Sequence, residues 1–178
     1  QTPLRAQQVA PDTWFVQGES ALGTRANRNF ISNAGFVVTR EGVIVVDALG
    51  SPALAEELLA EIARITPQPV RYVVVTHYHA DHVYGLQIFK ARGATIIAHA
   101  HGREYMASDT AALRLEASRE QLAPWIDAKT QLVAADRWLD DADLAITLGG
   151  ERFHIRHVGP AHTGEDLVVF AERAGVLF

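Results

Sequence analysis

The sequence contains no cysteine. Disulfide bonds and thiolate metal ligands are therefore excluded, and any metal site has to use His, Asp, Glu or water. Apolar runs such as Val43–Val46 and Val73–Val75 are far shorter than the about 20 residues that a membrane-spanning helix needs. The Arg residues are scattered, so the basic stripe that is typical of nucleic-acid binders is missing. We expect a small-molecule substrate and neither a membrane nor a nucleic acid as partner.

The composition is that of a globular protein. Of the 178 residues, 48% are hydrophobic and 21% are charged, and the net charge is −5. This composition excludes a disordered chain, and the length suffices for one domain with a sizeable core. No internal repeat or domain boundary is evident, so we expect one domain over residues 1–178. The start at Gln1 favours export to the periplasm or secretion, followed by removal of a signal; a trimmed cytoplasmic protein is the alternative.

The order of the predicted strands and helices indicates the α/β (α+β) class. Ser51 and Pro52 predict a capped helix start, because the hydroxyl accepts a hydrogen bond and proline has a helical φ. Gly42 predicts a hairpin turn, and the β-branched run Val70–Thr76 predicts a buried strand. Further strands are expected at Trp14–Gln17, Phe30–Thr39, Val43–Asp47, Ala94–Ala98, Asp143–Leu148, Glu151–Val158, Leu167–Ala171 and Val176–Phe178, and further helices at Gly85–Arg92 and Thr110–Leu122. We expect a mixed sheet with helices packed on it.

Four potential metal ligands follow the predicted strand Val70–Thr76 within six residues. They are His77, His79, Asp81 and His82. The first two project to the same side if the backbone is extended, whereas the adjacent Asp81 and His82 have to turn toward another position. Imidazole and carboxylate together suit zinc, and also iron or manganese. A polar loop with surface histidines is the ordinary alternative, and a structural zinc site is a rival that usually uses cysteine.

The pattern His-x-His-x-Asp-His after a strand resembles the signature of the metallo-β-lactamase superfamily. Two further landmarks are similar to that family and stand in its order. One is the strand Val43–Asp47 with the following Ala48-Leu49-Gly50 and a helix. The other is the segment Gly159–Asp166, which contains His162-Thr163. Together the landmarks cover essentially the whole chain.

The resemblance implies a role for each matching residue. His77, His79 and His162 match the ligands of a first metal ion, and Asp81 and His82 match ligands of a second. Asp81 is also the expected catalytic residue, because it would orient the nucleophile. The resemblance further implies that Asp47, Thr163 and Asp166 support the ligands or fix their loops.

The resemblance also implies an αββα sandwich. This chain would supply the first αβ half plus the following strands, and it would be incomplete at its C-terminus. The family's bridging Asp and last His would lie outside this sequence. Another chain or a missing C-terminal half would complete the sandwich.

The implied function is hydrolysis by a hydroxide held by one or two zinc ions. The substrate would have a carbonyl-type bond, as in a β-lactam, a thioester, a lactone or a related ester. No Ser nucleophile motif is present, which agrees with this chemistry. Two alternatives stay open: a di-iron oxidoreductase or dioxygenase on the same fold, and a non-catalytic metal-binding half-domain.

The remaining histidines carry weaker signals. His99 and His101 repeat the two-residue spacing after a strand, so they could line the rim of the site, although such residues are more often packed or exposed without a function. His154 and His157 lie on a predicted strand and are interpreted as structural. The aromatic residues Tyr84, Trp125 and Trp138 receive no role.

Overall fold

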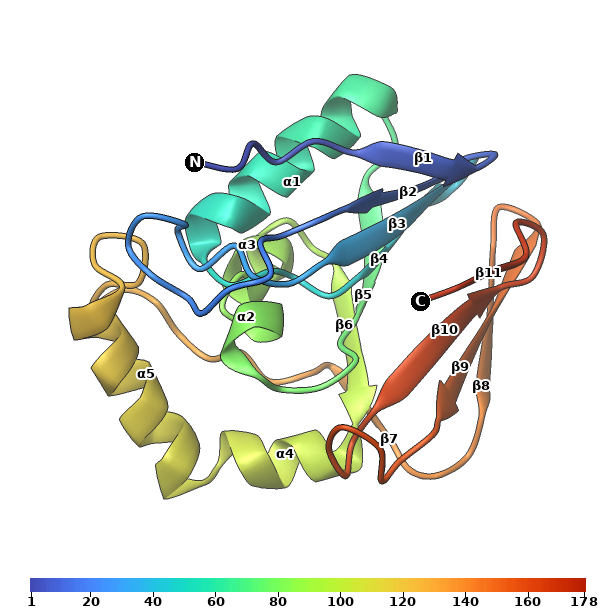
Figure 1. The fold of residues 1–178 in the computed structure, drawn as a ribbon. Helices are drawn as coiled ribbons and strands as arrows, with labels where there is room; N and C mark the ends of the chain where they lie inside the picture. Colours follow the sequence, from blue (N-terminus) through green and yellow to red (C-terminus); the bar gives the residue numbers. More distant parts are fainter.

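Eleven strands form two sheets in the computed structural model, which describes residues 1–178 (Figure 1). The seven-stranded sheet has the strands in chain order: β1 (Gln7–Ala10), β2 (Thr13–Val16), β3 (Ala34–Thr39), β4 (Gly42–Val46), β5 (Val70–Val74), β6 (Thr95–His99) and β7 (Arg137–Leu139). The four-stranded sheet has the order β11 (Val176–Leu177), β10 (Leu167–Ala171), β9 (Glu151–His157) and β8 (Leu144–Leu148). Neighbours are antiparallel throughout, except that β4, β5, β6 and β7 are parallel.

Five helices lie on one side of the seven-stranded sheet, and the four-stranded sheet lies on the other side (Figure 1). The helices are α1 (Pro52–Ile65), α2 (Ala80–Val83), α3 (Leu86–Ala91), α4 (Ala100–Met106) and α5 (Asp109–Gln121). The predicted αβ half with further strands is therefore confirmed. None of these helices has the length and apolar character needed to cross a membrane.

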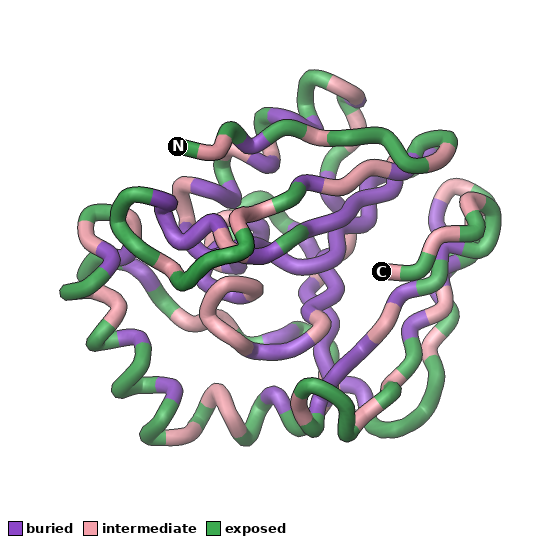
Figure 2. The backbone as a smooth tube through the Cα atoms, viewed as in Figure 1, coloured by how far each residue is buried: buried purple, intermediate pink, exposed green.

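The central strands are buried on both faces. In β4, Val43 and Val45 pack in the core shared with the helices, whereas Ile44 and Val46 pack in the core between the two sheets. Figure 2 shows the buried backbone concentrated in these central strands. Two covered faces explain why the sequence of β4 is continuously apolar and does not alternate. The parallel strands β4 to β7 therefore form the rigid part of the sheet, and their carboxyl ends lie along one edge.

The start of α1 follows the prediction. Ser51 caps the helix, and its buried Oγ accepts a hydrogen bond of 3.3 Å from the Leu54 N–H. Proline at the next position removes an N–H that would have no partner in the first turn.

Substituting Ser51→Ala is expected to destabilise the metal-free protein by about 1 kcal/mol, because the Leu54 N–H loses its acceptor. Urea denaturation measures this change. The Ser51→Gly variant should lose only a few tenths of a kcal/mol. Equal stability of the alanine variant and the parent would contradict the importance of the cap.

Several elements differ from the predictions. The sequence predicted one mixed sheet, but β8 to β11 form a separate sheet because their alternating inward residues, such as Phe153 and Ile155, pack against the first sheet. The strand predicted from Phe30 begins only at Ala34. Helices α2 and α4 and strands β1 and β7 were not predicted. Helix α2 and the two strands are short, and α4 contains Gly102 and lacks an apolar periodicity.

Candidate metal centre

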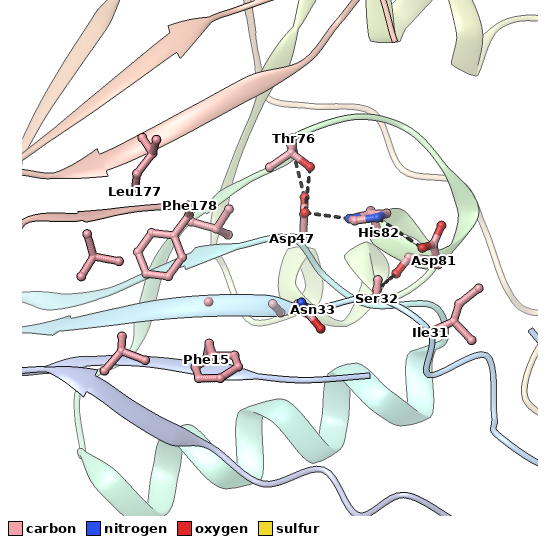
Figure 3. Close-up of a pocket in the computed structure, with 15 residues that line it drawn as sticks. Phe15, Ile31, Ser32, Asn33, Asp47, Thr76, Asp81, His82, Leu177 and Phe178 are labelled. Carbon is pink, nitrogen blue, oxygen red and sulfur yellow. Dashed lines mark hydrogen bonds and ion pairs between the residues drawn. The ribbon is translucent and has the colours of Figure 1, made fainter. Parts of the chain in front are cut away.

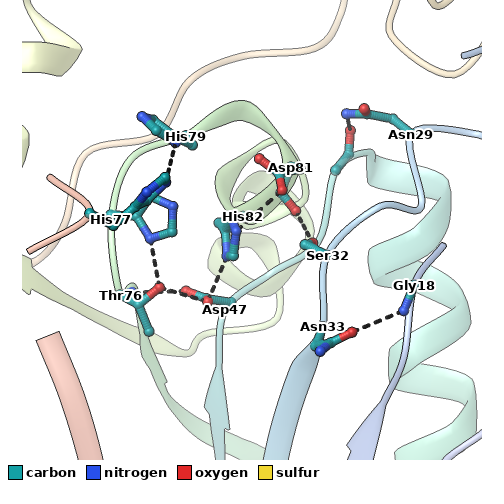
Figure 4. Close-up of polar contacts among 12 residues, drawn as sticks. Gly18, Asn29, Ser32, Asn33, Asp47, Thr76, His77, His79, Asp81 and His82 are labelled. Carbon is teal, nitrogen blue, oxygen red and sulfur yellow. Dashed lines mark hydrogen bonds and ion pairs between the residues drawn. The ribbon is translucent and has the colours of Figure 1, made fainter. Parts of the chain in front are cut away.

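Segments far apart in the sequence meet at the carboxyl edge of the parallel strands. Asp47 follows β4, and residues 75–79 follow β5 and lead into α2 (Figure 4). The Thr76 N–H donates to Asp47 Oδ1 over 2.8 Å, and the Thr76 carbonyl accepts from the Leu167 N–H over 3.0 Å. Because Leu167 begins β10, these bonds attach the loop after β5 to both sheets. A loop held in this way keeps its side chains in place.

Three histidines converge at this edge. The ring centroids of His77, His79 and His162 are 4.7 to 4.9 Å apart, and the rings are nearly perpendicular to one another. Their ligand nitrogens all lie within 4.8 Å of one another, and His79 Nδ1 is 3.2 Å from His162 Nε2. A tetrahedral zinc ion with Zn–N bonds of about 2.0–2.1 Å separates two nitrogens by about 3.3 Å. The donor set therefore fits a zinc ion.

His77 is oriented by its neighbours. Its Nδ1 lies 3.0 Å from Thr76 Oγ1, and the Thr76 hydroxyl donates to Asp47 Oδ2 over 2.8 Å. The hydroxyl proton is thus used, so His77 Nδ1 donates and Nε2 keeps its lone pair for a metal. Burial, together with the positive charges of nearby histidines, lowers the pKa of His77 to about 4. His77 is therefore neutral at pH 7, as a ligand has to be.

Asp81 and His82 occupy the first turn of α2, beside His77. His82 Nδ1 is 2.7 Å from Asp47 Oδ2, and His82 Nε2 is 3.2 Å from Asp81 Oδ2. Burial alone would lower the pKa of His82, but the two carboxylates outweigh it and raise the pKa to about 10. Burial likewise opposes ionisation of Asp81, and the hydrogen bond from His82 nevertheless holds its pKa below the usual value. In the metal-free protein the protonated ring of His82 thus lies between the carboxylates of Asp47 and Asp81.

Asp47 links both groups of candidate ligands. It accepts hydrogen bonds from the Thr76 N–H, the Thr76 hydroxyl and the His82 ring. Its backbone has a φ of 67°, a conformation that Asp tolerates better than most residues. The implied supporting role of Asp47 corresponds to these three contacts.

The loop that carries His162 is held mainly by acidic side chains. Asp166 accepts from both the backbone N–H and the hydroxyl of Thr163. Buried Glu165 accepts the Tyr78 N–H over 2.7 Å and so joins this loop to the one that carries His77 and His79. Sequence reasoning missed Glu165, because nothing in its local pattern distinguishes it from an exposed loop acid.

A cavity of about 630 Å³ lies next to Asp81 and His82 (Figure 3). Ser32, Asn33, Asp47 and Thr76 complete its polar side. The other walls are mostly apolar, with Val9, Phe15, Ile31, Val46, Val176, Leu177 and Phe178 among them. A small molecule with an apolar part fits such a cavity.

The other residues considered in the sequence lie elsewhere. Tyr84 is buried in the core, and the Trp125 indole donates to the Arg25 carbonyl. His154, in β9, pairs with Glu172, which lies in the turn after β10. His99, His101 and His157 form a cluster of their own and do not join the three candidate ligands.

Comparisons with known proteins point to one family. The family described as the metallo-beta-lactamase superfamily matches residues 27–178. Metallo-beta-lactamase IND-1 from Chryseobacterium indologenes is 23% identical over 156 residues, which are 88% of this chain and 56% of the relative. A linear primary-alkylsulfatase from Pseudomonas sp. is 39% identical over 49 residues, or 28% of this chain and 9% of the relative. The chain thus spans little more than half the length of IND-1.

Solved structures show the same fold. A metallo-beta-lactamase from Pontibacter korlensis aligns with a TM-score of 0.75 and 19% identity, covering 99% of this chain and 70% of that one. The sec-alkylsulfatase Pisa1 from Pseudomonas sp. aligns with a TM-score of 0.70 and 18% identity, covering 96% and 30%. The sequence match over residues 27–178 and the shared fold agree with the resemblance seen in the histidine motifs. The chain belongs to the metallo-β-lactamase superfamily.

Proposed function

We propose that this chain carries the metal centre of a zinc-dependent hydrolase that acts on a small molecule with a carbonyl-type bond, such as a β-lactam, a thioester or a lactone, or with a related ester bond. The observation that carries the proposal is the convergence of His77, His79 and His162 within 4.8 Å. Family membership supports metal-dependent hydrolysis in general.

Each candidate residue has a task in this proposal. His77, His79 and His162 would hold a first cation, and Asp81 and His82, which lie 3.2 Å apart, would hold a second. When bound, such cations polarise the substrate and lower the pKa of a water molecule to about 7. Asp81 would orient that water, while Asp47 keeps His82 and the loop of His77 in place.

The cavity beside Asp81 and His82 supports a substrate with an apolar group. Its apolar walls would hold that group, and its polar side would face the bond to be cleaved. Relatives named as lactamases and alkylsulfatases both act on small molecules, and both substrate types belong in the test.

The test combines metal analysis with hydrolysis assays on the full-length gene product. We expect one or two zinc equivalents and hydrolysis of at least one of nitrocefin, a thioester, a lactone and an alkyl sulfate. A chelator should reduce that activity about 100-fold or more, because the water loses its activation, and added zinc should restore it. A His154→Ala variant is the matched control, since this histidine contacts Glu172 and Phe170 and none of the candidate ligands.

Other outcomes would overturn the proposal. Full activity after chelation would end the metal mechanism. Bound iron with visible absorption would favour the di-iron oxidoreductase, because the same ligands suit iron. Bound zinc with no hydrolysis of any substrate would favour a non-catalytic metal-binding protein.

A further inference from the structure

Four polar side chains form a second cluster behind the loop of His162. His99 ends β6, His101 lies in α4, Asp141 lies between β7 and β8, and His157 ends β9. Asp141 Oδ1 is 3.0 Å from both His99 Nε2 and His157 Nδ1. The rings of His99 and His157 are stacked with centroids 4.0 Å apart. His99 is almost fully buried, although Asp141 is exposed.

The donor set of this cluster resembles a zinc site, but in the metal-free protein hydrogen bonds connect its members. His99 Nδ1 accepts the His101 N–H over 3.1 Å, so the ring proton of neutral His99 lies on Nε2 and is donated to Asp141. A zinc ligand would need the lone pair of Nε2. The interplanar angle of 17° also differs from the nearly perpendicular rings of His77, His79 and His162. In the metal-free protein His99 therefore donates a hydrogen bond to Asp141, and His157 Nδ1 lies 3.0 Å from the same carboxylate oxygen.

The cluster contacts the His162 loop at one atom, the carbonyl oxygen of Gly164. His157 Nε2 is 2.9 Å from it and His101 Nδ1 is 3.1 Å from it, and both nitrogens must donate because a carbonyl only accepts. Gly159 leaves the room for this contact, since a Cβ there would lie 2.8 Å from His157 Nε2 and 3.2 Å from Gly164 O. His162 is only two residues from the clamped carbonyl.

We infer that His101 and His157, held in place by His99 and Asp141, are positioning residues that fix the loop of His162 through the Gly164 carbonyl and thereby set the affinity for the first cation. The inference rests on the proposed function, because it takes His162 as a ligand. His162 is exposed and lies outside any helix or strand, so its imidazole is placed only by the ties of its loop. A loop that is ordered before the metal arrives loses less conformational entropy on binding.

The two donors can be tested with matched substitutions. An Asn amide nitrogen lies near the place of imidazole Nδ1, and a Gln amide nitrogen lies near the place of Nε2. Thus His101→Asn keeps the bond to Gly164, whereas His101→Ala and His101→Gln lose it. At the other position, His157→Gln keeps the bond and His157→Asn loses it. His101 is exposed, so its variants are expected to fold.

We expect each variant that loses its donor to bind zinc about threefold to tenfold more weakly in a chelator competition, which is the usual size of one lost hydrogen bond. His101→Asn and His157→Gln should recover most of the affinity. The visible spectrum of the Co²⁺-substituted protein should change in the variants without the donor, because the coordination by His162 becomes weaker. His154→Ala, on the same strand as His157, should match the parent in both measurements.

Unchanged zinc affinity and an unchanged Co²⁺ spectrum in both His101→Ala and His157→Asn would overturn the inference. So would equal weakening by His101→Ala and His101→Asn, since a specific hydrogen bond predicts rescue. A zinc equivalent that disappears in Asp141→Asn but remains in His77→Ala would establish a cation site in the cluster instead. Failure of the proposed function is recognised separately, because His77→Ala would then leave all the bound zinc in place.

Discussion

Replacing His77 with alanine is expected to reduce the affinity of the first site for zinc by more than the loss of a supporting residue does. Removing a residue that only hydrogen-bonds to a metal ligand typically lowers the metal affinity about 10–100-fold. The ring of His77 is 4.7 Å from that of His79 and 4.9 Å from that of His162, and its Nε2 is the nitrogen left free by the bond to Thr76. With two imidazoles left, the site has too few ligands for a catalytic zinc ion, which typically has about three from the protein. Competition with a chromophoric chelator measures the change, and hydrolysis should be lost with the metal.

Two controls separate ligation from folding. His154→Ala removes an imidazole from the four-stranded sheet without touching the site and should bind zinc like the parent. The metal-free His77→Ala protein should give the far-ultraviolet circular dichroism of the parent, because His77 lies in a loop beyond the end of β5. An unchanged zinc stoichiometry and affinity in a folded His77→Ala protein would refute the ligand assignment.

Replacing Asp47 with asparagine is expected to destabilise the metal-free protein by about 3 kcal/mol near pH 6.5, because it removes one partner of a buried ion pair. The asparagine oxygen still accepts the Thr76 N–H, but its amide group faces His82 Nδ1 and no longer attracts the charged ring. Asp81 still contacts His82, so part of the stabilisation remains. Denaturant unfolding of parent and variant gives the difference.

The same substitution predicts a pH dependence with a definite sign. The pKa of His82 is about 10 in the folded protein, against about 6.5 in an unfolded chain. A raised pKa means that its stabilisation is complete below pH 6.5 and is lost as the pH rises toward 10. The parent should therefore lose stability from pH 6.5 to 10, and the Asp47→Asn variant should lose less.

Measurement from pH 6.5 upward avoids the opposing effect of His77. Its pKa of about 4 in the folded protein means that the fold loses stability as the pH falls from 6.5 toward 4. Parallel curves for parent and Asp47→Asn between pH 6.5 and 10 would show that Asp47 does not hold the proton on His82.

Local sequence chemistry predicted many elements of the fold. Ser51-Pro52 placed the start of α1 correctly, and the apolar runs placed β4, β5 and β6 within one or two residues. These signals depend on neighbouring residues, which is why they can be read without a structure. Strand β7 has only three residues, so it carries no such signal. The separate second sheet also has no local signature, because only packing decides which strands pair.

In the candidate metal centre, too, some features depend on neighbouring residues and others on the packing of distant segments. The spacing of His77, His79, Asp81 and His82 after a buried strand is local, so the sequence alone predicted a cluster of potential metal ligands there. The tertiary structure decided three other features of the site. They are the contact of His162 with His79, the three hydrogen bonds of Asp47 and the hydrogen bond from Tyr78 to Glu165. The tertiary structure also decided the hydrogen bonds from His101 and His157 to the Gly164 carbonyl. In each case the partners come from different strands or loops, and the packing of the two sheets, not the spacing of residues along the chain, sets the distance between them.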